Sequence, residues 1–271
     1  MAGTVLVGTQ GWSYPAWVGP FYPPGTRTAD MLGVYARGFR TVEVDATFYA
    51  KPAEPVVRGW ANRVPRGFRL SLKVPQEVTH ERRLVDAAVP LEQFVERARL
   101  LGAALGPLLL QMPPDWTPSA AARAALAAFL PILPQDLKWA IEFRDPGWLD
   151  GPTVALLAER GVALALTDGP WLRRDRVLAL AAEPTADFAY VRWLGPDRRL
   201  TDYSRIQVNR DLELALWAEA LVALRRRVPT VYAYFNNHFE GHAPASARAM
   251  QVLLGETPVD PAGLRRQGEL F

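Results

Sequence analysis

Six charged residues stand at the ends of short apolar runs, and their types are those used for proton transfer and anion binding. Paired carboxylates act as general acids and bases, and they also bind hard cations such as Mg²⁺ or Mn²⁺. Lysine and arginine bind phosphate. We predict Glu43, Asp45 and Glu142 to be catalytic or metal-binding, and Lys73, Arg144 and Arg192 to contact an anion.

Lys73 is conspicuous because it is one of three lysines among 31 basic residues. A lysine at a strand end of a barrel can form a Schiff base with a carbonyl compound. The alternative is that it forms an ion pair with neighbouring acids. For all six charged residues, the plain alternative is a network that only fills the mouth of a barrel.

Strands and helices that would position these residues alternate along the chain. Eight apolar or β-branched runs are separated by helical, Ala- and Leu-rich stretches, which is typical of βα units and a parallel sheet. The spacing of about 34 residues per unit predicts a single α/β domain, a TIM-type (β/α)₈ barrel over residues 1–254, followed by a tail over 255–271. The predicted strands are 4–8, 41–45, 68–74, 107–112, 138–144, 162–168, 188–194 and 231–236. The predicted helices lie near 29–36, 54–63, 90–104, 118–130, 152–160, 171–180, 211–226 and 244–254.

Side chains of a barrel strand alternate between the interior and the helix layer. With Val42 and Val44 facing helices, Glu43 and Asp45 point inward. The same alternation turns inward Ser71, Lys73, Ala140, Glu142, Arg144, Tyr190 and Arg192. Barrel active sites lie at the carboxyl ends of the strands, so we expect the six charged residues to meet there.

An aromatic loop, GTQGWSYPAWVGPFYP at residues 8–23, follows the first predicted strand. Its glycines and prolines exclude regular structure. We predict that Trp12, Tyr14 and Trp17 wall the pocket and stack on a sugar ring or an unstacked base. The alternative is a hydrophobic plug that closes the barrel.

Polar residues also end the last predicted strand. Asn236, Asn237 and His238 are predicted to bind a ligand, because paired amides can hold a base edge or a sugar hydroxyl. Capping of the following helix is the alternative. The chain has only three histidines, and Gly241 and Pro244 interrupt the spacing from His238 to His242, which argues against a multi-zinc site. The metal, if any, is unknown, with Mg²⁺ or Mn²⁺ the best candidates.

Composition narrows the class of protein. The chain has 271 residues, no cysteine and a net charge of +3, and 49% of its residues are hydrophobic. These values fit a globular protein in a reducing compartment. No stretch of about 18 apolar residues occurs, so we expect a soluble, cytoplasmic protein without a membrane segment.

Seven motifs resemble the YecE-like family, also called domain of unknown function 72. They are the aromatic loop, TVEVDATFYAKP, GFRLSLKVPQEVTH, LLLQMPP, WAIEFRDPGW, YVRWLGP and YFNNHFEGHAPASA. The resemblance runs from about residue 5 to residue 254 and implies a TIM barrel. By analogy with phosphate-handling barrels, it also suggests a nucleic-acid or endonuclease role. This chain departs from the pattern at Asp45, where many members have Asn, and at Leu194, where many have His.

The last five residues, QGELF, resemble the peptide that binds the bacterial sliding clamp. In that peptide a glutamine and a Leu-Phe pair dock into an apolar pocket, and Gln267, Leu270 and Phe271 stand at these positions. The alternative is a tail that packs on the barrel.

We predict that the carboxyl face of the barrel binds nucleic acid, DNA or RNA, or another phosphate-containing ligand. If the protein is an enzyme, the expected class is a nuclease-like hydrolase acting in DNA repair. One alternative is a carbohydrate- or metabolite-active enzyme that uses the paired carboxylates. A non-catalytic adaptor is the third.

Overall fold

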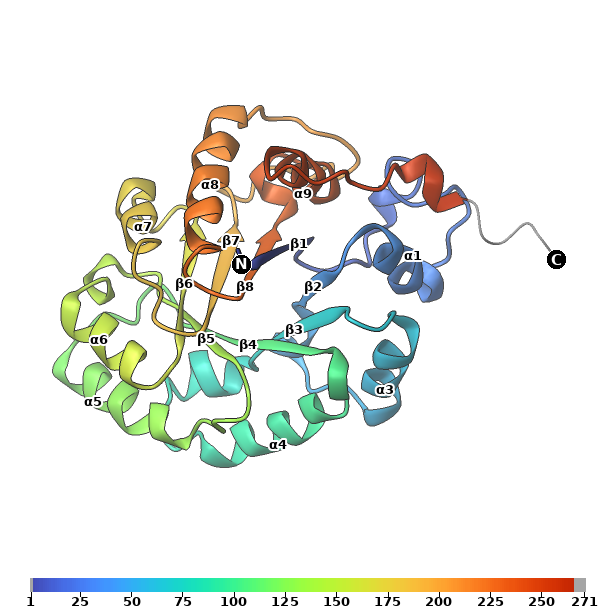
Figure 1. Ribbon diagram of the computed structural model, residues 1–271. Helices are drawn as coiled ribbons and strands as arrows, with labels where there is room; N and C mark the ends of the chain where they lie inside the picture. The colour runs from blue at the N-terminus through green and yellow to red at the C-terminus, as the bar shows by residue number, and fades with distance from the viewer. Residues whose placement is uncertain (1, 266–271) are drawn as a thin grey trace.

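Eight parallel strands form one sheet in the order β1-β8-β7-β6-β5-β4-β3-β2 (Figure 1). The protein is seen in a computed structural model that describes residues 2–265. The predicted barrel is confirmed, and each predicted strand is present within two residues of its expected ends. The strands are Thr4–Thr9 (β1), Thr41–Val44 (β2), Arg69–Lys73 (β3), Leu105–Gln111 (β4), Trp139–Glu142 (β5), Ala163–Asp168 (β6), Phe188–Trp193 (β7) and Thr230–Phe235 (β8).

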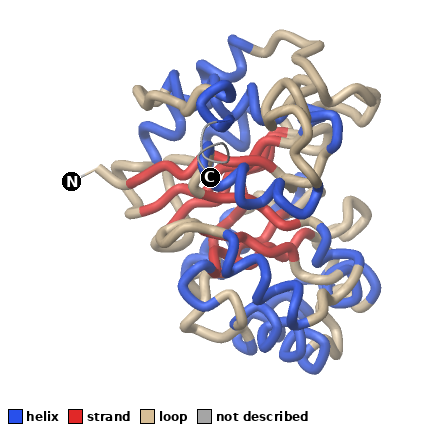
Figure 2. Tube along the Cα trace, turned by 90° about the vertical axis from the view of Figure 1, so that its right-hand side faces the viewer, coloured by secondary structure: helices blue, strands red, loops and turns tan. Residues whose placement is uncertain are grey.

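Helices form an outer layer around the strands (Figure 2). Their apolar faces cover the outward-facing side chains of the sheet, as the alternation of strands and helices along the sequence predicts. The eight predicted helices are present, together with a four-residue helix, α2, after β2 that the sequence analysis missed. The helices are Met31–Gly38 (α1), Ala46–Tyr49 (α2), Glu54–Arg63 (α3), Ala88–Arg99 (α4), Ala120–Phe129 (α5), Gly151–Glu159 (α6), Arg174–Leu180 (α7), Asp211–Leu224 (α8) and Ala243–Leu253 (α9).

The barrel closes where β1 meets β2. There the strands share only an isolated bridge between Gln10 and Glu43 rather than a ladder. The hydroxyl of Tyr35 fills the gap by accepting from the Thr9 N–H at 2.9 Å and lying 3.1 Å from the Thr41 carbonyl. A Cβ at Gly8 would lie 2.2 Å from that carbonyl oxygen, so only glycine allows this close approach.

Apolar and aromatic side chains fill the amino-terminal half of the barrel interior. Leu109, Phe188, Tyr190 and Tyr234 belong to this inner cluster. The Tyr234 hydroxyl lies 2.6 Å from the Ser71 hydroxyl and 2.7 Å from that of Thr41. The interior is therefore a packed floor, and the charged residues lie above it.

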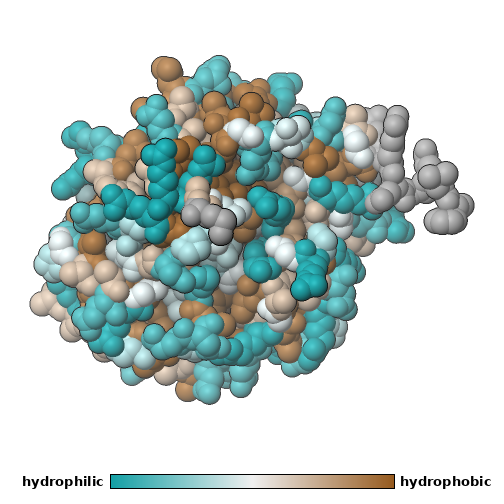
Figure 3. All heavy atoms as spheres, in the orientation of Figure 1, coloured by the Kyte–Doolittle hydropathy of each residue, from teal (hydrophilic) through white to brown (hydrophobic). Residues whose placement is uncertain are grey.

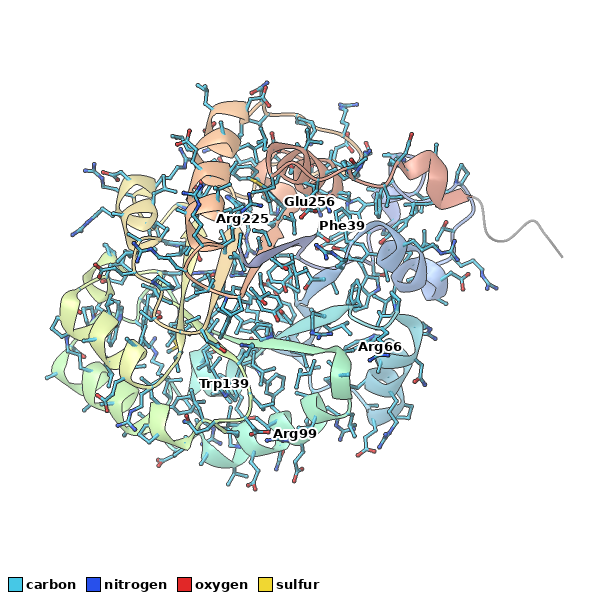
Figure 4. The ribbon with its side chains drawn as sticks, viewed as in Figure 1. Phe39, Arg66, Arg99, Trp139, Arg225 and Glu256 are labelled. Atoms are coloured by element: carbon cyan, nitrogen blue, oxygen red, sulfur yellow. The ribbon has the colours of Figure 1, made fainter. Side chains whose placement is uncertain are left out.

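Figures 1, 3 and 4 look at the end of the barrel where the strands begin. Mainly hydrophilic side chains cover this end (Figure 3). Phe39, Arg66 and Arg225, labelled in Figure 4, lie on the connections that lead into β2, β3 and β8. The carboxyl ends of the strands lie on the far side of these views and on the right in Figure 2.

The chain beyond α9 continues along the barrel. A short helical turn, Pro261–Arg265, contacts α1, and Leu264 is buried there. Arg37 of α1 donates to the Leu264 carbonyl at 3.4 Å. The segment that we expected to be a tail is thus attached to the barrel through Leu264, whereas residues 255–263 are exposed or partly buried. Gln267, Leu270 and Phe271 lie outside the described residues.

Within residues 2–265, the structure contains no helix with the length and apolar character needed to cross a membrane.

Candidate functional site

A cavity of about 430 Å³ opens at the carboxyl ends of the strands. Residues from strands β3, β4 and β7, from helix α2 and from the connections after β1, β2, β5, β6, β7 and β8 line it. Six of these residues carry the argument that follows: Asp45, Lys73, Arg144, Trp171, Arg192 and Arg198.

Arg192 of β7 stands at the centre of the charged network, with Glu43 of β2 on one side and Glu142 of β5 on the other. Its Nε and Nη2 donate to the two Glu43 carboxylate oxygens at 2.9 and 2.7 Å, which is a bidentate ion pair. Its Nη1 donates to Glu142 Oε2. All three side chains are buried. The strand alternation predicted this convergence correctly.

The rest of the network completes the hydrogen bonding of both carboxylates. Arg144 Nε donates to Glu142 Oε1 at 2.8 Å, and the Thr167 hydroxyl donates to Oε2 at 3.1 Å. The Tyr190 hydroxyl donates to Glu43 Oε2 at 2.7 Å. Two carboxylates and two guanidiniums neutralise one another, which is how buried charges are tolerated.

This pairing changes the roles expected of the glutamates and of Arg192. Burial alone would raise the pKa of Glu142, but Arg192 and Arg144 outweigh it and hold the pKa at about 2. Such a carboxylate stays ionised and is a poor proton carrier at neutral pH. Arg192 uses three of its five N–H donors on Glu43 and Glu142. Neither glutamate lines the cavity, whereas Arg192 does, so the pairing fits a structural platform beneath the cavity better than the catalytic glutamates that we expected.

Asp45 differs from the two glutamates. It follows β2 directly and lines the cavity. Its Oδ1 is buried and has no hydrogen-bond partner among residues 2–265, and its side chain does not cap α2. Burial and the neighbouring Glu43 carboxylate raise the pKa of Asp45 to about 7. Asp45 is thus the carboxyl group of the site that is poised to exchange a proton at neutral pH.

Lys73, the last residue of β3, presents its amine to the cavity. Among the described residues, its Nζ has no ion pair or hydrogen bond, and it lies 3.6 Å from the centroid of the Phe48 ring. Burial and the positive charge of Arg192 lower the pKa of Lys73 to about 8. The hydroxyl of Thr47 donates to the Lys73 carbonyl at 2.6 Å and fixes the strand end against α2.

Two further arginines face the cavity. The Arg144 guanidinium lies 3.8 Å from the centroid of the Trp171 ring, so one face of it is covered by an aromatic surface. Arg198 follows β7, is exposed, and forms no ion pair within the described part of the chain. Lys73 and Arg198 are thus the lining cations that have no ion pair in the described chain, and Asp45 and Asp197 are the acids that line the same cavity.

The aromatic loop is placed differently from our expectation. Tyr14 lines the cavity, whereas Trp12 packs edge-on against Trp60 and does not line it. Trp17 is fully buried, and its indole N–H donates to Asn237 Oδ1 at 3.1 Å. A ring with no exposed face cannot stack on a ligand, so the prediction for Trp17 is wrong and the plug interpretation describes it better.

Of the polar residues after β8, only some line the cavity. Asn236 and His238 line the cavity, and Asn236 Nδ2 donates to Gln10 Oε1 at 2.9 Å. Asn237 points away from the cavity and is buried. Its Oδ1 accepts from the Ala243 N–H at 3.0 Å, which secures the start of α9. The predicted ligand contact by Asn237 is therefore wrong, and the capping alternative holds.

Several cavity residues were missed. Tyr49 ends α2, Gln111 ends β4, and Trp171 and Arg198 lie on the loops after β6 and β7. The loop after β3 contains a π-helical turn, Glu77–Glu81, followed by left-handed backbone at Arg83 and Leu84, with φ of 48° and 70°. Strained connections of this kind gather at functional sites. Apolar runs in the sequence do not indicate where such strained loops lie.

The metal-binding expectation finds little support in the side chains. Within residues 2–265, no three His, Asp or Glu side chains are grouped as ligands for a metal ion. Asp168, the acid that ends β6, accepts from Arg174 Nε at 2.6 Å and from the Trp217 indole N–H at 2.7 Å. Its oxygens hold α7 and α8 in place.

A family model described as protein of unknown function DUF72 matches residues 6–267. The chain belongs to the DUF72 family. Relatives of this DUF72 protein include UPF0759 protein YunF of Bacillus subtilis (strain 168), which is 24% identical over 98% of this chain and 100% of its own length. UPF0759 protein YecE of Escherichia coli (strain K12) is 30% identical over 52% of this chain and 49% of its own length.

Solved structures agree with this assignment. A DUF72 family protein from Thermotoga maritima MSB8 has a TM-score of 0.80 and 28% identity, and the match covers 93% of this chain and all of that one. A glycoside hydrolase family 5 enzyme from Prevotella bryantii B14 has a TM-score of 0.53 at 11% identity, covering 93% and 95%. The second likeness reflects the barrel fold alone.

Asp45 and Leu194, the two positions at which the sequence analysis expected a departure from the family pattern, both lie on the cavity wall. Asp45 brings a titratable carboxyl group to the cavity, and Leu194 brings an apolar side chain.

Proposed function

We propose that this DUF72 protein binds a phosphate-bearing ligand in the cavity at the carboxyl ends of its strands. The observation that carries the proposal is the pair of cations, Lys73 and Arg198, that face the cavity without a carboxylate partner in the described chain. A doubly charged phosphate supplies the missing partner, and lysine and arginine are its usual ligands.

The size of the cavity bears on the class of ligand. A volume of about 430 Å³ accommodates one nucleotide or sugar phosphate unit. The aromatic faces at its wall, Tyr14, Tyr49 and Trp171, suit stacking on a single base or sugar ring. A nucleic acid would enter this cavity with one unpaired nucleotide, while its backbone follows the exposed Arg198.

We propose that Asp45 acts as the general base in a reaction on the bound phosphate group. A carboxyl group with a pKa near neutrality can take a proton from water as it attacks a phosphodiester. Phosphodiester hydrolysis in DNA repair is the form of activity that we propose for this residue. Glu43 and Glu142 support it only by holding Arg192 beneath the site.

The carbohydrate alternative is weaker on this geometry. Glycoside hydrolysis needs two carboxyl groups that flank the sugar, one of them able to donate a proton. Here Glu43 and Glu142 bind the same guanidinium and are buried. No observation favours a separate second function over phosphate binding.

The test is binding of labelled single-stranded and duplex DNA over a salt series, with competition by inorganic phosphate and by a neutral methyl glucoside. We expect salt-sensitive binding of single strands that phosphate suppresses and the glucoside does not, since phosphate contacts release counterions. The double variant Lys73→Met/Arg198→Ala should lose it, and Lys51→Met, which changes an exposed lysine, should retain it.

Two results would overturn parts of the proposal. Competition by the glucoside rather than by phosphate would replace it with carbohydrate binding. Binding of small phosphates without binding of DNA would retain the phosphate site and remove nucleic acid as its ligand.

A further inference from the structure

The surroundings of Lys73 differ from those of a lysine in an ordinary ion pair. Its side chain is only 8% exposed, yet its amine meets no carboxylate within hydrogen-bonding distance among residues 2–265. Of the acids that act on its charge, Glu43 and Glu142 are already occupied by Arg192, and Asp45 lies close enough to raise its pKa without a hydrogen bond to it. A buried lysine without a partner is costly, so its position at the cavity wall calls for a role in the cavity.

We propose that Lys73 is a nucleophilic amine that forms an imine with the carbonyl carbon of a phosphorylated aldehyde or ketone, such as an open-chain sugar phosphate. The proposal rests on the proposed phosphate site for the phosphate of this substrate, and it adds the reacting group. Inorganic phosphate would lie between Lys73 and Arg198, whereas the phosphate of this substrate would be held by Arg198 and Arg144, with the carbonyl facing the neutral amine of Lys73.

The surroundings of the amine favour the neutral form that attacks a carbonyl. Burial and Arg192 lower the pKa of Lys73 to about 8, against an ordinary value of 10.5. At pH 7.5 the neutral fraction is therefore about 240-fold larger than for an ordinary lysine. The Phe48 ring acts in the opposite sense, because it stabilises the ammonium, and it holds the amine in place.

Asp45 supplies the proton that imine formation needs. The amine lone pair forms the C–N bond, and the nitrogen proton passes to the former carbonyl oxygen to give a carbinolamine. Asp45 in its protonated form then donates to the carbinolamine hydroxyl, the C–O bond breaks, and water leaves with the iminium on Lys73. The pKa of about 7 provides both protonation states of Asp45 near neutral pH.

The backbone around Lys73 is suited to such a role. The Val74 N–H, next in the chain, donates to the Leu109 carbonyl at 2.9 Å, so the strand end is fixed on the β4 side. The Thr47 hydroxyl holds the Lys73 carbonyl from the α2 side. The amine is thus presented from a rigid element, which favours a defined attack direction.

The experiment compares pyridoxal 5′-phosphate with pyridoxal as probes, each trapped on the full chain with sodium borohydride at pH 7.5. Peptide mass spectrometry then measures modification at each lysine. Lys51 and Lys138 are internal controls: Lys51 is exposed and hydrogen-bonded to Gln93, and Lys138 is partly buried and paired with Asp187. We expect pyridoxal phosphate to modify Lys73 at least about tenfold faster than either control. This factor is smaller than the ratio of the neutral fractions of Lys73 and an ordinary lysine.

Further arms separate this inference from the phosphate site. Inorganic phosphate should suppress modification of Lys73 by pyridoxal phosphate, and Arg198→Ala should remove the advantage of pyridoxal phosphate over pyridoxal. Rapid and equal modification of Lys73 by both probes would support the reactive amine and contradict the phosphate site. Modification of Lys73 no faster than that of Lys51 and Lys138 by both probes would overturn the imine proposal, even where phosphate binding is measured independently.

Asp45→Asn tests the assignment of the proton donor. We expect slower trapping at Lys73 with pyridoxal phosphate binding intact, measured as competition against inorganic phosphate. An unchanged trapping rate in this variant would overturn the role of Asp45.

Discussion

The amine of Lys73 lies 3.6 Å from the centroid of the Phe48 ring, and no carboxylate of the described chain pairs with it. On another wall of the same cavity, Arg192 binds two glutamates at once. The same cavity thus contains one cation that is fully neutralised and one that is not. This contrast separates the groups that support the site from the groups that are available to a ligand.

The first prediction concerns Asp45 and stability. Its folded-state pKa of about 7 lies above the ordinary 3.8, so the folded protein loses stability as pH rises from about 4 to 7. Asp45→Asn removes this penalty. We expect the variant to be more stable than the wild type at pH 8, on the order of 1–3 kcal/mol, and equal to it near pH 3.5. Thermal unfolding at the two pH values measures this difference, and a variant that is less stable at pH 8 would refute it.

The second prediction concerns Arg192. Arg192→Met leaves Glu43 and Glu142 buried without their shared partner, and breaking a buried ion pair costs about 3–5 kcal/mol. We expect this loss in urea unfolding. Replacing both glutamates with glutamine in the same variant should recover much of it, because no uncompensated charge then remains. A stable single variant would mean that the network is open to solvent.

The third prediction separates the buried amide from the cavity. Asn237→Ala leaves the Trp17 indole N–H and the Ala243 N–H without their acceptor, which costs about 1–3 kcal/mol. Phosphate affinity of the folded protein should be unchanged, since Asn237 does not line the cavity. A variant of normal stability with weakened phosphate binding would return Asn237 to the site.

The fourth prediction concerns the carboxyl-terminal peptide, which lies outside the described residues. We propose that Gln267, Leu270 and Phe271 bind the bacterial sliding clamp. Deleting 267–271 should abolish co-purification with the clamp and leave the unfolding temperature unchanged. Leu264→Ala serves as the contrasting variant, because it changes a buried side chain against α1. Clamp binding that survives the deletion would remove this partner.

Much of the fold and the inner half of the site follow from one rule. Alternation along each strand brings Glu43, Lys73, Glu142 and Arg192 to the same end of the barrel, and the structure confirms this convergence. Their pairing does not follow from the rule. Arg192 and Glu43 are 149 residues apart, and only the register of the closed barrel decides that they meet.

The alternation rule does not predict where the side chains of loop residues lie. Trp17 and Tyr14 belong to one irregular loop, where no periodicity distinguishes a buried ring from an exposed one. Trp171 and Arg198 follow β6 and β7 on connections without a composition signal, so the sequence did not single them out. The four-residue helix α2 is likewise too short to show a helical period.

If the unpaired amine of Lys73 belongs to a phosphate site, calorimetric titration with inorganic phosphate will show it. The measurement uses the wild type, Lys73→Met and Lys51→Met at pH 7 and low salt. We predict saturable binding to the wild type and to Lys51→Met, and its loss in Lys73→Met. Equal binding to all three proteins, or no binding to the wild type, would contradict the account.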